Sequence, residues 1–118
     1  MTTRLAALAL FLLLPLFAAD PSGKWTASFD TQIGQQDYTY EFKAEGGKLT
    51  GMAKSKMGET AIQEGRADGD KISFVEIFKF NDMDIRIVYT GKINGDEIAF
   101  TRQVAEFATE QLVAKRAK

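Results

Sequence analysis

The sequence predicts an all-β protein, an eight-stranded antiparallel up-and-down barrel that follows a cleaved signal peptide. Three observations predict it: turn signals at nearly even spacing, apolar residues that alternate between those turns, and a leader-like segment ahead of the first turn. Seven turn signals imply eight strands. The turns are Ile33-Gly34-Gln35, Glu45-Gly46-Gly47, Lys56-Met57-Gly58, Asp68-Gly69-Asp70, Asn81-Asp82, Asn94-Gly95-Asp96 and a softer break from Ala105 to Ala108.

Residues 1–19 have the features of a secretory signal, which leaves residues 20–118 as a single mature domain. An early arginine is followed by a run without charge at residues 5–17, and Ala18-Ala19 precede the mature chain. A membrane anchor is the alternative, but a spanning helix needs about 20 apolar residues, and Pro15 interrupts this shorter run. We therefore expect cleavage near residue 19 and a secreted or periplasmic protein with no membrane span.

Apolar residues occupy alternate positions between the turns, as expected for strands that turn one face inward. The clearest examples, in chain order, are Trp25, Ala27 and Phe29; Tyr38, Tyr40 and Phe42; Ile72 and Phe74; Ile85, Ile87 and Tyr89; and Ile98 and Phe100. The segment from Val104 to Lys118 has the composition of a helix but lacks a continuous apolar stripe. Its second half is therefore predicted to form the last strand.

Two hairpin sequences match at an offset of 26 residues, Gly65 to Phe74 and Gly91 to Phe100, and Lys43 to Leu49 is a fainter copy. Convergent turn chemistry explains the match as well as duplication does. Alternate connections of an up-and-down sheet share one edge, so these three hairpins and both termini should close one end of the barrel. Closure also removes the sheet edges that would recruit other chains.

The composition argues against several functional classes. The chain has 15 basic and 16 acidic side chains, and it contains neither histidine nor cysteine. Interspersed charges offer no cationic face to nucleic acid. The usual general base, thiolate nucleophile and zinc ligands are missing as well. We therefore expect a binding protein rather than an enzyme, with no cofactor and no metal, and the sequence gives no indication of the oligomeric state.

Gly23-Lys24-Trp25, at the start of the first strand, resembles the G-x-W signature of the calycin superfamily, which comprises lipocalins, fatty-acid-binding proteins and avidins. The resemblance implies that Trp25 closes the barrel floor and that a basic residue near the C-terminal end packs across it. Arg116 is placed to do so, because the last strand ends at the edge where the first begins. A guanidinium stacked on indole gains about 0.5–2 kcal/mol, depending on burial.

The stretch from Gly23 to Arg116 also resembles a small bacterial secreted domain that is found alone or beside sugar-active enzyme domains. The matching motifs are Phe42-Lys43 with Gly46 and Leu49-Thr50-Gly51; Gly65, Gly69-Asp70, Ile72 and Phe74; Tyr89, Gly91 and Gly95-Asp96; and Ala114-Lys115-Arg116. This resemblance implies a fold rather than an activity.

A ligand would enter at the end opposite Trp25, where the other four connections form a rim. An eight-stranded barrel is just wide enough to be filled by its own side chains or to hold one small ligand. The candidate ligand-binding residues are Tyr38, Tyr40, Glu64, Glu76 and Arg102 on the inward register and Met57, Phe80, Met83 and Phe107 at the rim. Rim methionines and aromatic rings suit an apolar guest, or they cap the core.

The inward charges allow two interpretations. Desolvating an unpaired charge costs several kcal/mol, so Glu64 or Glu76 should pair with Arg102 in a structural ion pair. Alternatively, these groups anchor a carboxylate, hydroxyl or sugar, with the tyrosines supplying hydrogen bonds and stacking area. A register slip or a bulge would turn the charges to solvent. Glu64 and Glu76 could formally serve as the acid and base of a glycosidase, but no catalytic motif surrounds them.

The sequence thus predicts a barrel that binds a small apolar or amphipathic molecule or a saccharide. The alternative is a solid barrel that acts as an accessory or interaction domain on a polysaccharide or a partner protein. An exposed planar row of aromatic side chains would favour this alternative, and a pocket that reaches inward would favour the first function. Hairpin chemistry explains Asp68-Gly69-Asp70 and Asn94-Gly95-Asp96 better than calcium binding does.

Overall fold

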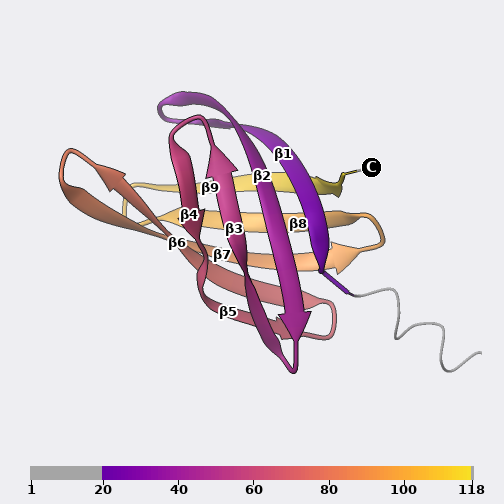
Figure 1. The fold of residues 1–118 in the computed structure, drawn as a ribbon. Helices are drawn as coiled ribbons and strands as arrows, with labels where there is room; N and C mark the ends of the chain where they lie inside the picture. Colours follow the sequence, from indigo (N-terminus) through magenta and orange to yellow (C-terminus); the bar gives the residue numbers. More distant parts are fainter. Residues whose placement is uncertain (1–19, 118) are drawn as a thin grey trace, which may run out of the picture.

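The computed structural model describes residues 20–117, which form one antiparallel β-sheet closed into a barrel (Figure 1). The signal peptide predicted at residues 1–19 lies outside the described residues. The strands are β1 (Gly23–Thr31), β2 (Gly34–Glu45), β3 (Lys48–Ser55), β4 (Gly58–Ala61), β5 (Gln63–Asp68), β6 (Lys71–Phe80), β7 (Met83–Asn94), β8 (Glu97–Val104) and β9 (Ala108–Arg116). Because β4 and β5 are two halves of one strand, the predicted eight-stranded barrel is confirmed.

The strands follow one another around the barrel in chain order, and the predicted turns connect them. The first and last strands close the sheet through the pairs Trp25↔Arg116 and Thr26↔Lys115. The predicted last strand is also present, because β9 pairs with β8 over all but its last residue, from Val104↔Ala108 to Glu97↔Lys115. This long ladder outweighs the helix-forming composition of the segment.

The fourth barrel strand departs from an ideal geometry at Ile62, where β4 ends and β5 begins. Strand β4 pairs with β3, whereas β5 pairs mainly with β6, and the β5–β6 register shifts between Gln63 and Arg66. Within this irregularity Glu64 has a φ of 55°, in the left-handed region that non-glycine residues rarely adopt. A bulge re-aims the side chain that it carries, and the inward register predicted for Glu64 is therefore wrong.

Gly65 and Gly91, which begin the two repeated hairpin sequences, both allow neighbouring strands to approach closely. A Cβ atom on Gly65 would lie 1.9 Å from the backbone oxygen of Leu49, and one on Gly91 would lie 2.6 Å from the ring of Phe100. The repeated sequence therefore specifies packing beside the hairpin as well as the turn itself.

The barrel interior is filled with aromatic side chains. Trp25 is fully buried at the floor, the end of the barrel where β1 begins and β9 ends. Beyond it, Tyr40, Phe42, Phe74, Tyr89 and Phe100 form a cluster whose neighbouring ring centroids are 4.3–6.1 Å apart. Such edge-to-face and offset contacts add to the stabilisation from burial, so the lower part of the barrel is a packed core.

Candidate functional site

The floor of the barrel is sealed by Trp25 and Arg116. The guanidinium carbon of Arg116 lies 4.2 Å from the centroid of the indole ring. Arg116 also donates hydrogen bonds to the backbone oxygens of Ser22 and Asp20, and the indole nitrogen of Trp25 donates to the backbone oxygen of Pro21. These bonds hold the segment that precedes β1 against the floor. Hydrogen bonds as well as the stacked side chains therefore close this end of the barrel.

The opposite end, or mouth, contains a cavity of about 400 Å³. Apolar side chains such as Phe78, Ile85, Ile87 and Val104 form most of its wall. Exposed apolar residues from all four rim connections surround the entrance: Ile33 (62%), Met57 (53%), Phe80 (46%), Met83 (56%) and Phe107 (61%). Small-molecule sites are typically cavities of about 300–1,000 Å³ with a mainly apolar wall and a few placed polar groups, and this cavity has that character.

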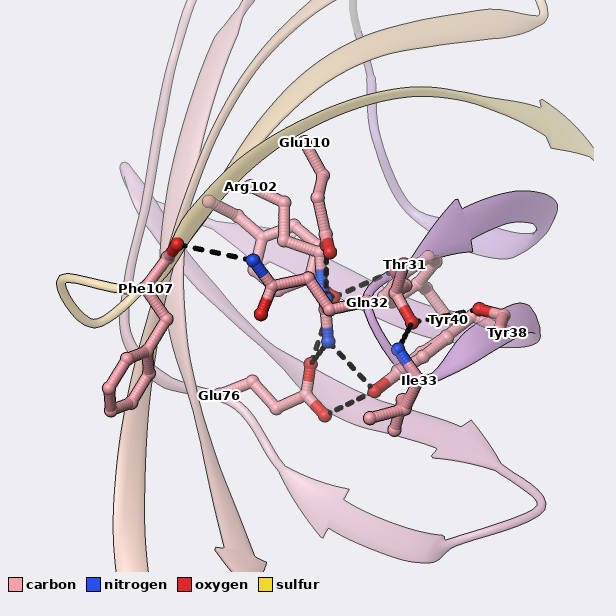
Figure 2. A network of polar contacts seen from close by, with 11 residues as sticks. Thr31, Gln32, Ile33, Tyr38, Tyr40, Glu76, Arg102, Phe107 and Glu110 are labelled. Atoms are coloured by element: carbon pink, nitrogen blue, oxygen red, sulfur yellow. Dashed lines mark hydrogen bonds and ion pairs between the residues drawn. The ribbon is translucent and has the colours of Figure 1, made fainter.

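The base of the cavity is a buried polar network centred on Arg102 (Figure 2). Arg102 donates from Nε to the hydroxyl of Tyr89 at 2.8 Å, from Nη1 to Oε1 of Glu110 at 2.5 Å and from Nη2 to the hydroxyl of Tyr38 at 3.2 Å. Its Nη2 also lies 3.8 Å from Oε1 of Glu76. Arg102 and Glu76 are only 5% and 3% exposed, so this ion pair lies inside the barrel.

The direction of each hydroxyl hydrogen bond follows from its partners. Because Arg102 donates to the hydroxyls of Tyr38 and Tyr89, each tyrosine directs its own proton to Glu76, over 2.7 Å to Oε2 and 2.8 Å to Oε1, respectively. Tyr40 then donates to Tyr89 across 2.9 Å. Both carboxylate oxygens of Glu76 thus act as acceptors. Within residues 20–117, no buried side-chain nitrogen or oxygen lacks a partner.

The environment of the network shifts the pKa values of its members. Burial raises the pKa of Tyr38, Tyr40 and Tyr89, and the negative charge of Glu76 raises each of them further. Burial by itself lowers the pKa of Arg102, but its interactions with Tyr89, Tyr38 and Glu76 outweigh that effect and raise the pKa above its usual value. The hydroxyls therefore stay neutral and the guanidinium stays charged.

The network can be followed spectroscopically, because Tyr38, Tyr40 and Tyr89 are the three tyrosines of the chain. We expect the phenolate absorbance of the folded protein to stay flat through about pH 10, where an exposed tyrosine is half ionised. The folded state retains protons that the unfolded state releases, so the free energy of unfolding should fall as the pH rises above about 10. Parallel measurement of phenolate absorbance and circular dichroism in an alkaline titration checks this expectation.

The same titration in concentrated denaturant is the control, since all three tyrosines should then ionise near about pH 10. Phenolate absorbance that rises while the circular dichroism remains native would contradict the buried network.

The structure brings together four of the predicted inward residues, which are Tyr38, Tyr40, Glu76 and Arg102. Tyr38 and Arg102 line the cavity. Glu76 and Tyr40 lie behind them, 3% and 0% exposed. The predicted rim residues Met57, Phe80 and Met83 also line the cavity, as does Phe107.

Glu64 lies on the outer surface, away from this network. Its two carboxylate oxygens accept hydrogen bonds from Nη1 and Nη2 of Arg86 at 2.7 and 2.8 Å. This hydrogen bonding lowers the pKa of Glu64. Glu76 is enclosed by the barrel wall, so the two carboxylates do not flank a common site as a glycosidase would require.

Glu110 also belongs to the network, although it is not among the site residues that the sequence predicts. Its side chain is 10% exposed and makes the shortest contact to Arg102. Leu112 and Ala114 are buried at alternate positions of β9, and the same alternation extended back by two residues reaches Glu110. The helix-like composition of the C-terminal segment obscured this signal.

No protein-family model matches the chain, and neither a curated protein nor a solved structure matches it. The class of the protein is given by its architecture alone, which is a closed eight-stranded antiparallel barrel with a buried aromatic cluster. In the described residues, no helix has the length and apolar character that a membrane span requires. Between residues 20 and 117, no group of three or more histidine, cysteine, aspartate or glutamate side chains could hold a metal ion.

Proposed function

We propose that this protein is a calycin-type barrel that binds a small apolar or amphipathic molecule in the cavity opposite Trp25. The cavity at the mouth is the observation that carries the proposal. It has a volume of about 400 Å³, its wall is mainly apolar, and its base presents polar atoms of Tyr38, Arg102 and Glu110. Such a cavity removes an apolar body from water while polar groups at the base fix its orientation.

The exposed apolar rim supports the same function. Large exposed apolar side chains are gathered around the entrance at Ile33, Met57, Phe80, Met83 and Phe107. Among the residues described, Phe80 and Phe107 are the exposed aromatic side chains, and both lie at the mouth. A flat row of rings on the outer wall would have favoured a polysaccharide or protein contact. The concentration of apolar surface at the mouth favours entry of a small molecule.

We also propose that residues 1–19 direct export and that the mature chain works in the periplasm or outside the cell. The uncharged run and the small residues Ala18-Ala19 support this proposal.

A cavity-filling substitution tests the binding function. We expect the neutral fluorophore N-phenylnaphthylamine to bind the protein and Ala108→Trp to weaken that binding by about tenfold or more, a change of about 1.4 kcal/mol, because Ala108 lines the cavity. Thr109→Trp is the matched control, since the next residue of β9 is exposed and points outward. A fluorescence titration of all three proteins measures the affinities.

Binding that is lost equally in both variants, or retained equally in both, would overturn the assignment of the cavity as the site. Native mass spectrometry of protein purified from its own host gives an independent readout, because a retained small molecule should be displaced by N-phenylnaphthylamine.

A further inference from the structure

We propose that the cavity selects amphiphiles whose head group donates hydrogen bonds, an ammonium above all, and discriminates against carboxylates. This inference rests on the binding function proposed above and names the chemical class of the ligand. The deciding group is Glu110, which presents an acceptor at the base of the cavity.

The base of the cavity carries more negative than positive charge. Arg102 and Glu110 are the charged residues that line the cavity. Glu76 lies directly behind, with its Oε1 3.8 Å from Nη2 of Arg102. Two carboxylates thus face one guanidinium. A ligand carboxylate would add a third negative charge, whereas an ammonium would balance the site, and exclusion of water strengthens both effects.

Arg102 is already engaged by the protein. Each of its three side-chain nitrogens donates to a protein oxygen, on Tyr89, Glu110 or Tyr38. Its guanidinium carbon also lies 5.3–5.6 Å from the ring centroids of Phe29, Tyr38 and Tyr89. A ligand carboxylate that took the N–H of Nη1 now donated to Glu110 would displace Glu110 and leave that carboxylate buried without its cation, which is costly.

Glu110 retains an acceptor for a ligand. Its side chain is 10% exposed, and its Oε1 accepts from Arg102. No residue from 20 to 117 donates to its other oxygen, Oε2, and because every fully buried side-chain oxygen in this range has a partner, Oε2 must retain accessible surface. An ammonium or hydroxyl in the cavity would make a charge-assisted hydrogen bond to this atom. The apolar body of the same molecule would then lie against wall residues such as Ile85 and Val104.

Three probes with the same alkyl chain test the selectivity: octylamine, octanol and octanoate. Isothermal titration calorimetry at neutral pH and one ionic strength measures their affinities. We expect octylamine to bind about 10- to 100-fold more tightly than octanoate, with octanol between them, which is the range expected for one hydrogen bond to a charged group.

A pair of charge-neutralising variants assigns the effect to its residue. Glu110→Gln keeps an oxygen acceptor for Arg102 but removes the charge, so the preference for octylamine over octanoate should largely disappear. Glu106→Gln removes the same charge from an exposed position in the turn before β9, and the preference should persist. Near-ultraviolet circular dichroism checks that both variants are folded, and the order of the three probes on the unmodified protein tests the selectivity without any variant.

The outcomes separate this inference from the function on which it rests. Octanoate that binds as tightly as octylamine overturns the selectivity, while binding of any probe in the cavity preserves the proposed function. A preference that survives Glu110→Gln overturns the role of that residue. Failure of all three probes and of N-phenylnaphthylamine to bind overturns the binding function itself.

Discussion

The substitution Arg102→Leu is expected to lower the free energy of unfolding by about 3–5 kcal/mol, the usual cost of removing one partner from a buried ion pair. The variant leaves Glu76 and Glu110 inside the barrel without the cation that faces them. It also removes the hydrogen bonds that the hydroxyls of Tyr38 and Tyr89 accept from Arg102. Because a small domain has a total stability of about 5–15 kcal/mol, equilibrium denaturation should detect the loss readily.

Arg86→Leu is the matched control for this prediction. Arg86 makes a close bidentate pair with Glu64, at 2.7 and 2.8 Å, but the two side chains are 53% and 57% exposed. A solvent-exposed pair contributes little to stability because water and salt screen it, so this variant should remain close to the unmodified protein. If Arg102→Leu is no more destabilised than Arg86→Leu, Arg102 does not form a buried ion pair with Glu76 and Glu110.

A double variant shows where the cost of Arg102→Leu arises. Adding Glu76→Gln to Arg102→Leu removes one of the two buried negative charges that have lost their cation. The amide oxygen of the new side chain can still accept a hydrogen bond from a tyrosine hydroxyl. The double variant should therefore recover part of the lost stability. Further destabilisation instead would mean that hydrogen bonding to Glu76, rather than its charge, dominates the network.

The position of the polar network supports the proposed binding function. Buried ion pairs can often be replaced by apolar residues of similar volume with little loss, or even a gain, in stability. The interior near the floor is filled by apolar and aromatic side chains, whereas the charged groups lie at the base of the cavity. In the described residues, the buried charged groups therefore lie next to the cavity in which we propose that a ligand binds.

The barrel itself could be predicted because its determinants are local. Turn residues such as Asn94-Gly95-Asp96 set the hairpins, and alternating residues such as Ile85 and Ile87 set the inward face. Each signal lies within a few residues of the structure it specifies. The number of strands, their order and the positions of floor and mouth all follow from such signals.

The composition of the site was harder to predict because it depends on contacts between distant segments. The outward position of Glu64 results from a bulge beside Gly65, which packs against the backbone of Leu49. The inward position of Glu110 depends on its pairing with Arg102 across β8 and β9. The cavity likewise depends on side chains from several strands. Periodicity within β9 reaches Glu110, but periodicity in one segment contains neither the bulge at Glu64 nor the cavity.

The substitution Trp25→Ala is expected to lower the free energy of unfolding by about 3–5 kcal/mol, the range for removing a large buried aromatic side chain. Trp25 is 0% exposed, and its loss also removes the ring under Arg116 and the hydrogen bond to Pro21. Arg116→Ala should cost less, because the guanidinium is partly exposed and leaves no large void. Thermal and denaturant unfolding, followed by circular dichroism, measures both variants.

Ligand affinity distinguishes the floor from the mouth. Trp25 and Arg116 lie at the closed end of the barrel, and the cavity lies at the other end, with the aromatic cluster packed between them. Any Arg116→Ala protein that remains folded should therefore bind N-phenylnaphthylamine as tightly as the unmodified protein, although its unfolding transition is shifted. A loss of affinity in that folded variant would contradict the separation between a floor that stabilises the barrel and a mouth that binds.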